Sequence, residues 1–221
     1  MNRPPEMTTT PAPTATEVSL RQLGVDATWK VTARPDALVV MPPSGGQVTL
    51  EGDALRAAVT MTHALTGKPL LNLRLAEGRV ILVMSEHDVG QIARGLGPSA
   101  AAATAVTLNA NWNLLIGVLI SFNAAHAMLA PAAEAEVVSP ALEGVRLAVG
   151  ALAMASGALG RLRPRRHLLL ADTVWMAAIV AEAVHHLVAG EGLAWALLVA
   201  LMTPFAWGRL RLYQLLGPVA R

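Results

Sequence analysis

The chain has 221 residues, of which 54% are hydrophobic and 14% are charged, and its mean hydropathy is +0.48. This composition is too apolar for an ordinary soluble domain and indicates an integral membrane protein. The formal net charge is +2, and the basic residues of the second half cluster at the ends of apolar segments, which excludes nucleic acid as the expected partner. Because the chain has no cysteine, a disulfide, a thiolate metal site and a cysteine nucleophile are excluded.

The first segment, residues 1–27, begins MNRPPEMTTTPAPTATE and contains few large apolar side chains. A Pro/Thr/Ala-rich segment of this kind buries too little surface to order itself, so we expect a flexible tail. A short helix around residues 18–23 is an alternative for its end. The first 25 residues hold no apolar signal-peptide region, so we expect no signal peptide.

Residues 28–98 are predicted to form a small α+β domain of order ββ(β)αββα. Apolar and polar residues alternate over 28–34, a turn leads into ALVVM, and a third short strand is predicted at 47–50. A helix of about 13 residues is predicted within EGDALRAAVTMTHALTG, followed by a hairpin of strands 71–75 and 79–84. Ser85 is the predicted N-cap of a last short helix. We find no catalytic constellation here and interpret His63 as a boundary histidine, so a binding or scaffolding role is expected.

Residues 99–213 are predicted to form an all-α bundle of four transmembrane helices, at about 108–130, 142–159, 167–189 and 193–208, followed by a cytoplasmic tail at 214–221. Each segment approaches the roughly 20 apolar residues that span a hydrocarbon core. In the first span, small or polar residues recur every four positions, which is typical of a helix-packing face. They are Asn109, Asn113, Gly117 and Ser121.

Charged loops predict the orientation of the bundle. Basic residues favour the cytoplasmic side, and they gather between the second and third spans and after the fourth. They are Arg161, Arg163, Arg165, Arg166, Arg209 and Arg211. The loop with Glu134 and Glu136 is acidic and is expected outside. Both termini and the 28–98 domain are then cytoplasmic, in the inner membrane of a bacterial cell.

The third span is unusual because it carries ionisable residues. At about 100° per residue, Asp172, Glu182 and His186 share one face, and His185 lies at its edge. Such groups are costly in lipid, so this face should look into the bundle or into a wet cavity. A histidine or Arg146 of the second span is a candidate partner for Glu182.

These patterns leave three functional hypotheses. The first is an accessory, assembly or scaffold subunit of a larger membrane complex, whose partners are other membrane subunits or further copies of the chain, the bilayer, and a soluble protein at the 28–98 domain. The second is a small proton or cation transporter that uses Asp172, Glu182 and His186. The third is a redox subunit with b-type haem held by His126 and His185, which lie at similar predicted depth. The sequence assigns no catalytic residue and no metal site, which favours a role other than catalysis.

Overall fold

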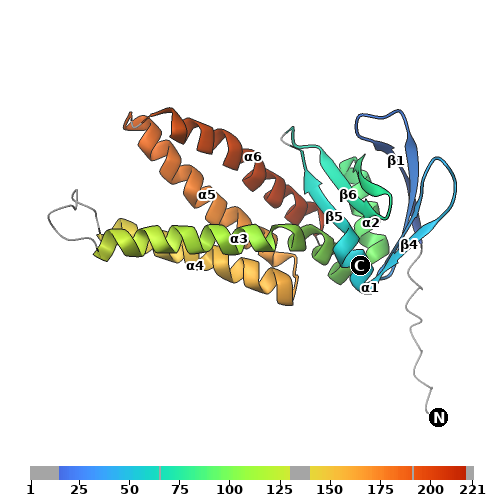
Figure 1. The fold of residues 1–221 in the computed structure, drawn as a ribbon, viewed down its shortest axis with the longest axis horizontal. Coiled ribbons are helices and arrows are strands. Elements are labelled where there is room, and N and C mark those ends of the chain that lie inside the picture. Colours follow the sequence, from blue (N-terminus) through green and yellow to red (C-terminus); the bar gives the residue numbers. More distant parts are fainter. Residues whose placement is uncertain (1–14, 65, 130–139, 191, 218–221) are drawn as a thin grey trace, which may run out of the picture.

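The computed structural model describes residues 15–64, 66–129, 140–190 and 192–217, and for residues 107–109 and 140 it describes the backbone alone. A sheet domain packs against one end of four long helices (Figure 1). The strands form one antiparallel, curled sheet of order β4-β3-β2-β1-β7-β6-β5. They are β1 (Thr16–Gln22), β2 (Thr28–Arg34), β3 (Ala37–Met41), β4 (Val48–Glu51), β5 (Val59–His63), β6 (Pro69–Leu75) and β7 (Gly78–Val83).

Strand β1 lies in the middle of the sheet, where a tail was predicted. It pairs with β2 from Thr16↔Ala33 to Arg21↔Thr28 and joins the two halves of the sheet through Arg21↔Val83. The predicted tail and its alternative helix are therefore wrong for Thr16–Gln22, while residues 1–14 lie outside the described chain. The physical reason is strand pairing: Val18 and Leu20 alternate with polar residues, and they are buried once β1 lies between β2 and β7 in the sheet.

The predicted 13-residue helix is also wrong in its second half. Helix α1 covers only Gly52–Ala58, and the chain continues directly as β5. The segment VTMTH is rich in β-branched residues, which favour strands. In β5, Val59 and Met61 point into the core with 1% and 0% exposure, and Val59 pairs with Leu73 of β6.

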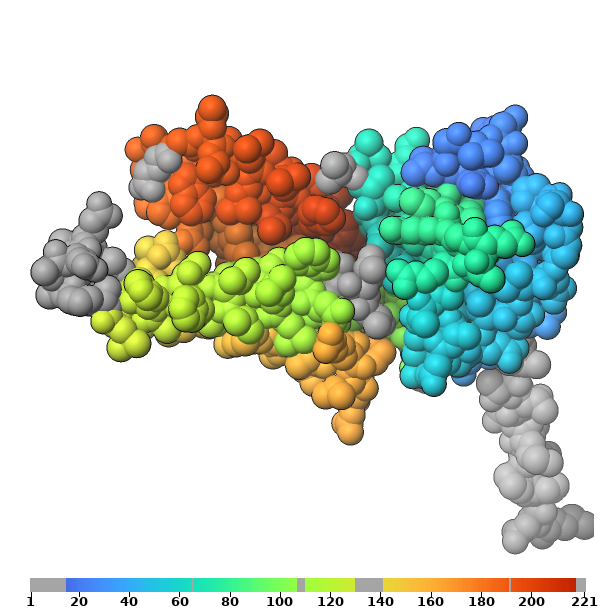
Figure 2. All heavy atoms as spheres, in the orientation of Figure 1, coloured from blue at the N-terminus to red at the C-terminus, as the bar shows by residue number. Residues whose placement is uncertain are grey.

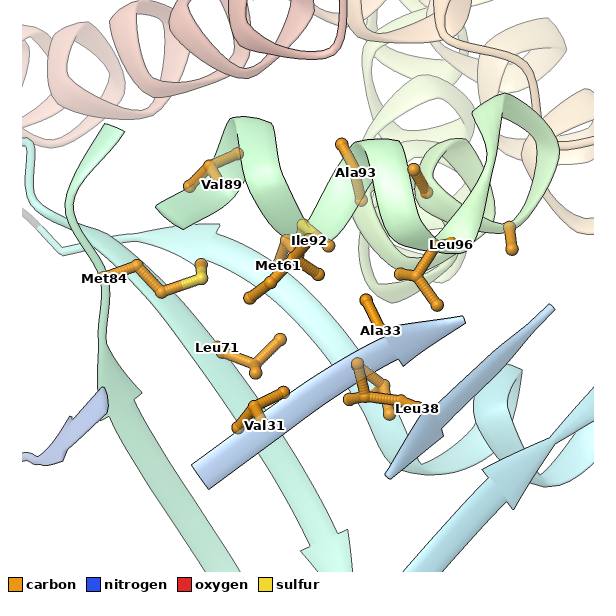
Figure 3. Packing of buried hydrophobic residues seen from close by; sticks show 14 of the residues in the cluster. Val31, Ala33, Leu38, Met61, Leu71, Met84, Val89, Ile92, Ala93 and Leu96 are labelled. Carbon is orange, nitrogen blue, oxygen red and sulfur yellow. The ribbon is translucent and has the colours of Figure 1, made fainter. Parts of the chain in front are cut away.

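Helix α2 (Glu86–Leu96) closes the core of the sheet domain. Its N-terminus has the predicted cap. Ser85 Oγ accepts a hydrogen bond from the Asp88 backbone N–H at 3.1 Å, and the Asp88 carboxylate accepts one from the Ser85 backbone N–H. Val89, Ile92 and Leu96 are buried on its inner face. Figure 3 shows this row above core residues of the strands.

The remaining helices are α3 (Pro98–Leu129), α4 (Pro140–Leu162), α5 (His167–Val188) and α6 (Leu193–Leu215), and each contains a segment long and apolar enough to cross a membrane. Helix α3 begins ten residues before the predicted first span, because the alanine-rich segment is strongly helix-forming and packs against the sheet domain. Helix α6 runs on past its predicted end near 208 to Leu215, which shortens the predicted C-terminal tail.

The sheet domain and the helices share one hydrophobic core. Ala101 and Val106 of α3, Leu169 of α5 and Leu212 of α6 are each at most 2% exposed and belong to the same cluster as the strand residues. The domain is therefore fused to the bundle and does not hang from a flexible linker. The space-filling view shows the continuous body that results (Figure 2). The arginine-rich loop between α4 and α5 and the end of α6 lie at this junction, while the end of α3 and the start of α4 lie at the far end of the bundle.

Candidate functional site

Close backbone packing joins α3 to α4. A Cβ atom on Gly157 would lie 2.6 Å from the Ala110 carbonyl oxygen, and one on Gly117 would lie 2.6 Å from the Gly150 carbonyl oxygen. These glycines let the two helices approach closely, as small residues do in membranes. Gly117 belongs to the predicted packing face, Ser121 approaches the Gly150 position, and the side chain of Asn109 lies outside the described residues.

A buried polar cluster crosses the bundle beside the sheet domain. Asn113 of α3 donates to Asp172 Oδ1 of α5 at 2.7 Å and to Ser156 Oγ of α4 at 3.1 Å. Asp172 is 1% exposed and Asn113 is 3% exposed. Asn113 thus joins three helices, which is a packing role that the sequence pattern predicted for its face.

Arg209 places a positive charge beside this cluster. It was predicted to mark the cytoplasmic end of the fourth span, but it is 5% exposed and donates from Nη1 to the Ala105 carbonyl at 2.7 Å. Its guanidinium also interacts electrostatically with Asp172. The sheet domain covers this part of α6, so the Arg209 side chain is buried and not exposed at a membrane surface.

The other predicted topology residues lie at the same end of the bundle. Arg161 donates from Nε to Asn111 Oδ1 at 2.7 Å, Arg166 lies 4.4 Å from the centre of the Tyr213 ring, and Arg211 makes two hydrogen bonds of 2.8 Å to Glu86. Arg163 and Arg165 are exposed. The basic residues therefore gather where the sheet domain meets the helices. The acidic loop with Glu134 and Glu136 lies outside the described residues.

An ionic cluster occupies the far third of the bundle. Arg146 of α4 donates from Nε to Glu182 Oε1 of α5 at 2.6 Å, and from Nη1 to Glu143 of its own helix. His186 Nε2 lies 3.8 Å from the same Glu182 oxygen. Glu143 is 1% exposed, and one of its oxygens has no hydrogen-bond partner among the described residues. Glu182 thus contacts both partners that the sequence suggested.

Trp195 at the start of α6 completes this cluster. Its ring stacks on His186 with centroids 4.2 Å apart and planes 13° apart. Sequence reasoning missed this residue, and it assigned no role to Glu143. The available signal was the i, i+3 spacing of Glu143 and Arg146, with Arg146 the single basic residue of the second predicted span.

A cleft of about 740 Å³ lies between the α3–α4 hairpin and the α5–α6 hairpin. Most of its wall is apolar, from residues such as Ile116, Val149 and Leu198, and its polar wall contains Arg146 and Glu182 with both His185 and His186. All four helices contribute to it. Such an arrangement can bind an apolar segment that carries a complementary charge.

An apolar layer separates the two polar clusters. Trp175 and Ala153 are 0% exposed and Met176 is 6% exposed, and Ile179 packs against them. Apolar residues of α5 therefore lie between Asp172 and Glu182. The two clusters form no continuous polar path through the part of the chain that is described.

The histidines proposed for haem do not line one cavity. His185 lines the cleft and contacts His186, whereas His126 is exposed on α3, contacts Phe122 at 6.4 Å between ring centroids and does not line the cleft. Among the described residues no group of three or more His, Asp or Glu side chains is arranged to hold a metal ion.

Comparison of the chain with protein-family models, with curated proteins and with solved structures gives no match. The four apolar helices fit a membrane protein, and the functional argument rests on the geometry described above.

Proposed function

We propose that this multi-pass membrane protein is an accessory or assembly subunit of a larger membrane complex, and that its cleft receives a transmembrane helix of a partner subunit. The observation that carries the proposal is the incomplete burial of the ionic cluster. The side chains of Arg146 and Glu182 remain 27% and 28% exposed in the isolated chain. Glu182 lies six residues before the end of α5, about 9 Å along its axis, so this exposed surface falls within the bilayer.

The charge of the cluster predicts the chemistry of the partner. Glu143 and Glu182 carry two negative charges against the single guanidinium of Arg146, so one negative charge is left over while the histidines are neutral. Charges within a membrane are usually paired across helices. We therefore expect the partner helix to carry a lysine or arginine at the depth of Glu182.

The dimensions of the cleft suit a helix. Its wall includes Ile116 to Asn123 on α3, Leu142 to Val149 on α4, and similar two-turn stretches of α5 and α6. Eight residues of helix rise about 12 Å, so about two turns of a partner helix would be enclosed. The shared core beneath the sheet domain supports a scaffold role, because a partner bound in the cleft and a soluble partner on the domain would be held in a fixed relation.

Photo-crosslinking in native membranes tests this proposal. A photoreactive residue at Leu198, inside the cleft, is expected to crosslink to one partner subunit, and the same residue at Leu201, 52% exposed on the same helix, is expected not to. Peptide mapping should place the crosslink on a helix with a basic residue, and Glu182→Gln should reduce the yield. Equal crosslinking from both positions would contradict the proposal, and so would a crosslink to a second copy of this chain.

Proton or cation transport is the second candidate, because Asp172 is buried and the side chains of Glu182 and His186 are 28% and 17% exposed on one face of α5. The apolar layer around Trp175 and Met176 would have to open during each cycle. Flux into proteoliposomes should then fall in Glu182→Gln and rise in Trp175→Ala, which removes the largest side chain of the layer. Flux equal to that of empty vesicles would reject transport.

A further inference from the structure

A second cavity, of about 270 Å³, lies where the sheet domain meets the membrane helices. One wall comes from β5, β6 and β7, and the other from α6 between Pro204 and Leu212. It is separate from the cleft at the far end of the bundle. Because the sheet domain packs on the C-terminal part of α6, a candidate membrane span, we expect this cavity to lie near the membrane surface.

Two arginines bring positive charge and hydrogen-bond donors to this cavity. Arg79 and Arg209 both line it, together with His63, and none of the residues described as lining it is acidic. Arg209 is 5% exposed, and its described hydrogen bond to Ala105 uses one of the five N–H donors of a guanidinium. The buried guanidinium of Arg209 therefore places a positive charge in the cavity wall.

His63 adds a donor that the protein itself does not use. Neither of its ring nitrogens has a hydrogen-bond partner among the described residues, although both are buried. A neutral imidazole carries one N–H and one acceptor, and leaving them unpaired costs free energy. Gly208 keeps the space beside this ring open, since a Cβ there would lie 3.1 Å from His63 Cβ. A bound ligand with oxygen acceptors would satisfy the imidazole.

Neutral polar side chains hold the surface-exposed Arg79 in place. Arg79 donates to Asn72 Oδ1 at 3.1 Å, and Asn72 donates to Thr62 Oγ1 at 2.9 Å. This chain of contacts fixes the guanidinium beside the cavity. Leu70, Phe205 and Leu212 supply an apolar wall next to these donors.

We infer that this cavity binds a phosphate ester, with Arg79, Arg209 and His63 as donors to its oxygens. Guanidinium groups match phosphate oxygens geometrically, and the cavity brings two of them together with an unpaired imidazole. The volume accommodates a phosphate with a glycerol-sized substituent and not a whole lipid. Basic pockets between membrane helices are suited to the head groups of anionic lipids, and the apolar wall fits the start of an acyl chain.

The test uses the full chain in nanodiscs of phosphatidylcholine, with and without phosphatidylglycerol, and counts retained lipid by native mass spectrometry. Arg79→Gln removes one charged donor and is expected to weaken phosphatidylglycerol binding about tenfold or more. Arg74→Gln is the matched control, because Arg74 is exposed on β6 and does not line the cavity. Arg209→Lys keeps the charge but removes the planar fork, and it should also weaken binding.

A parallel titration with inorganic phosphate and glycerol 3-phosphate, in phosphatidylcholine nanodiscs, distinguishes the two sources of the ligand. If inorganic phosphate or glycerol 3-phosphate binds with the same dependence on Arg79, the result supports the site and indicates a soluble ligand. Retention of phosphatidylglycerol alone would support a lipid head group. The inference is overturned if neither probe binds above the phosphatidylcholine background, or if Arg74→Gln and Arg79→Gln weaken binding equally.

Discussion

Replacing Gly157 by alanine tests the close packing of α3 and α4. The new Cβ would lie 2.6 Å from the Ala110 carbonyl oxygen and 2.8 Å from the Leu114 backbone nitrogen. Because these atoms belong to the backbone of α3, no rotamer change relieves the overlap and the helices must separate. Overpacking of this kind costs about 1–3 kcal/mol. Alanine also gains up to about 1 kcal/mol of helix propensity over glycine, which offsets part of the cost.

Gly144→Ala supplies the matched control on the same helix. A Cβ at Gly144 meets no atom within 4 Å, so this variant has the propensity gain without the overlap. The difference in unfolding free energy between the two variants therefore isolates the overpacking cost, and we expect Gly157→Ala to be less stable by about 1–3 kcal/mol. Equilibrium unfolding in mixed micelles measures this difference. Equal stabilities for the two variants would refute the packing described for α3 and α4.

Three further outcomes follow from buried or capped polar groups. Asn113→Leu leaves the buried Asp172 carboxylate without its 2.7 Å donor and should lower the unfolding free energy by about 1–3 kcal/mol, measured in the same micelles, whereas Asn123→Leu in the cleft wall should have little effect. Ser85→Ala removes the cap of α2 and should cost about 1 kcal/mol, seen as a lower midpoint of thermal unfolding; an unchanged midpoint would contradict the capping box. Burial, and then the nearby Arg209 guanidinium, lower the pKa of His63 below its ordinary value of 6.5, so the unfolded chain binds a proton there more readily than the folded protein. The stability that comes from a neutral His63 is complete above pH 6.5 and is lost as pH falls through the lowered pKa. The unfolding free energy of His63→Gln should therefore fall less steeply at acid pH than that of the original protein. The same slope in both proteins would contradict the role given to His63.

Local patterns were sufficient for elements whose stability is local. The N-cap at Ser85, the inner face of α2 and the existence of four long apolar helices all follow from spacing within one segment, and the structure has each of them. Helix bounds were less predictable. The extension of α3 to Pro98 and of α6 to Leu215 depends on a core that the helices share with the sheet domain, and neither helix alone shows where such a core lies.

The strands β1 and β5 depended on pairing with other strands, which the segments alone do not reveal. Residues Thr16–Gln22 are too polar to predict a strand by themselves, and they are ordered by pairing with β2 on one side and β7 on the other. The segment VTMTH follows a helix-like pattern until its pairing with β6 is known. Propensity is a weak guide where tertiary pairing decides, which is why both segments were assigned to the wrong class.

The ionisable residues of α5 also show what a local sequence pattern cannot predict. Helical periodicity placed Asp172, Glu182 and His186 on one face, and burial or partial burial of all three agrees with that placement. Periodicity does not reveal what lies opposite each residue. Asp172 faces neutral donors and a buried arginine, whereas Glu182 faces Arg146 beside an open cleft. Two carboxylates ten residues apart on one helix therefore have different surroundings: the first is enclosed by its own chain, and the second retains exposed charge that a binding partner can pair.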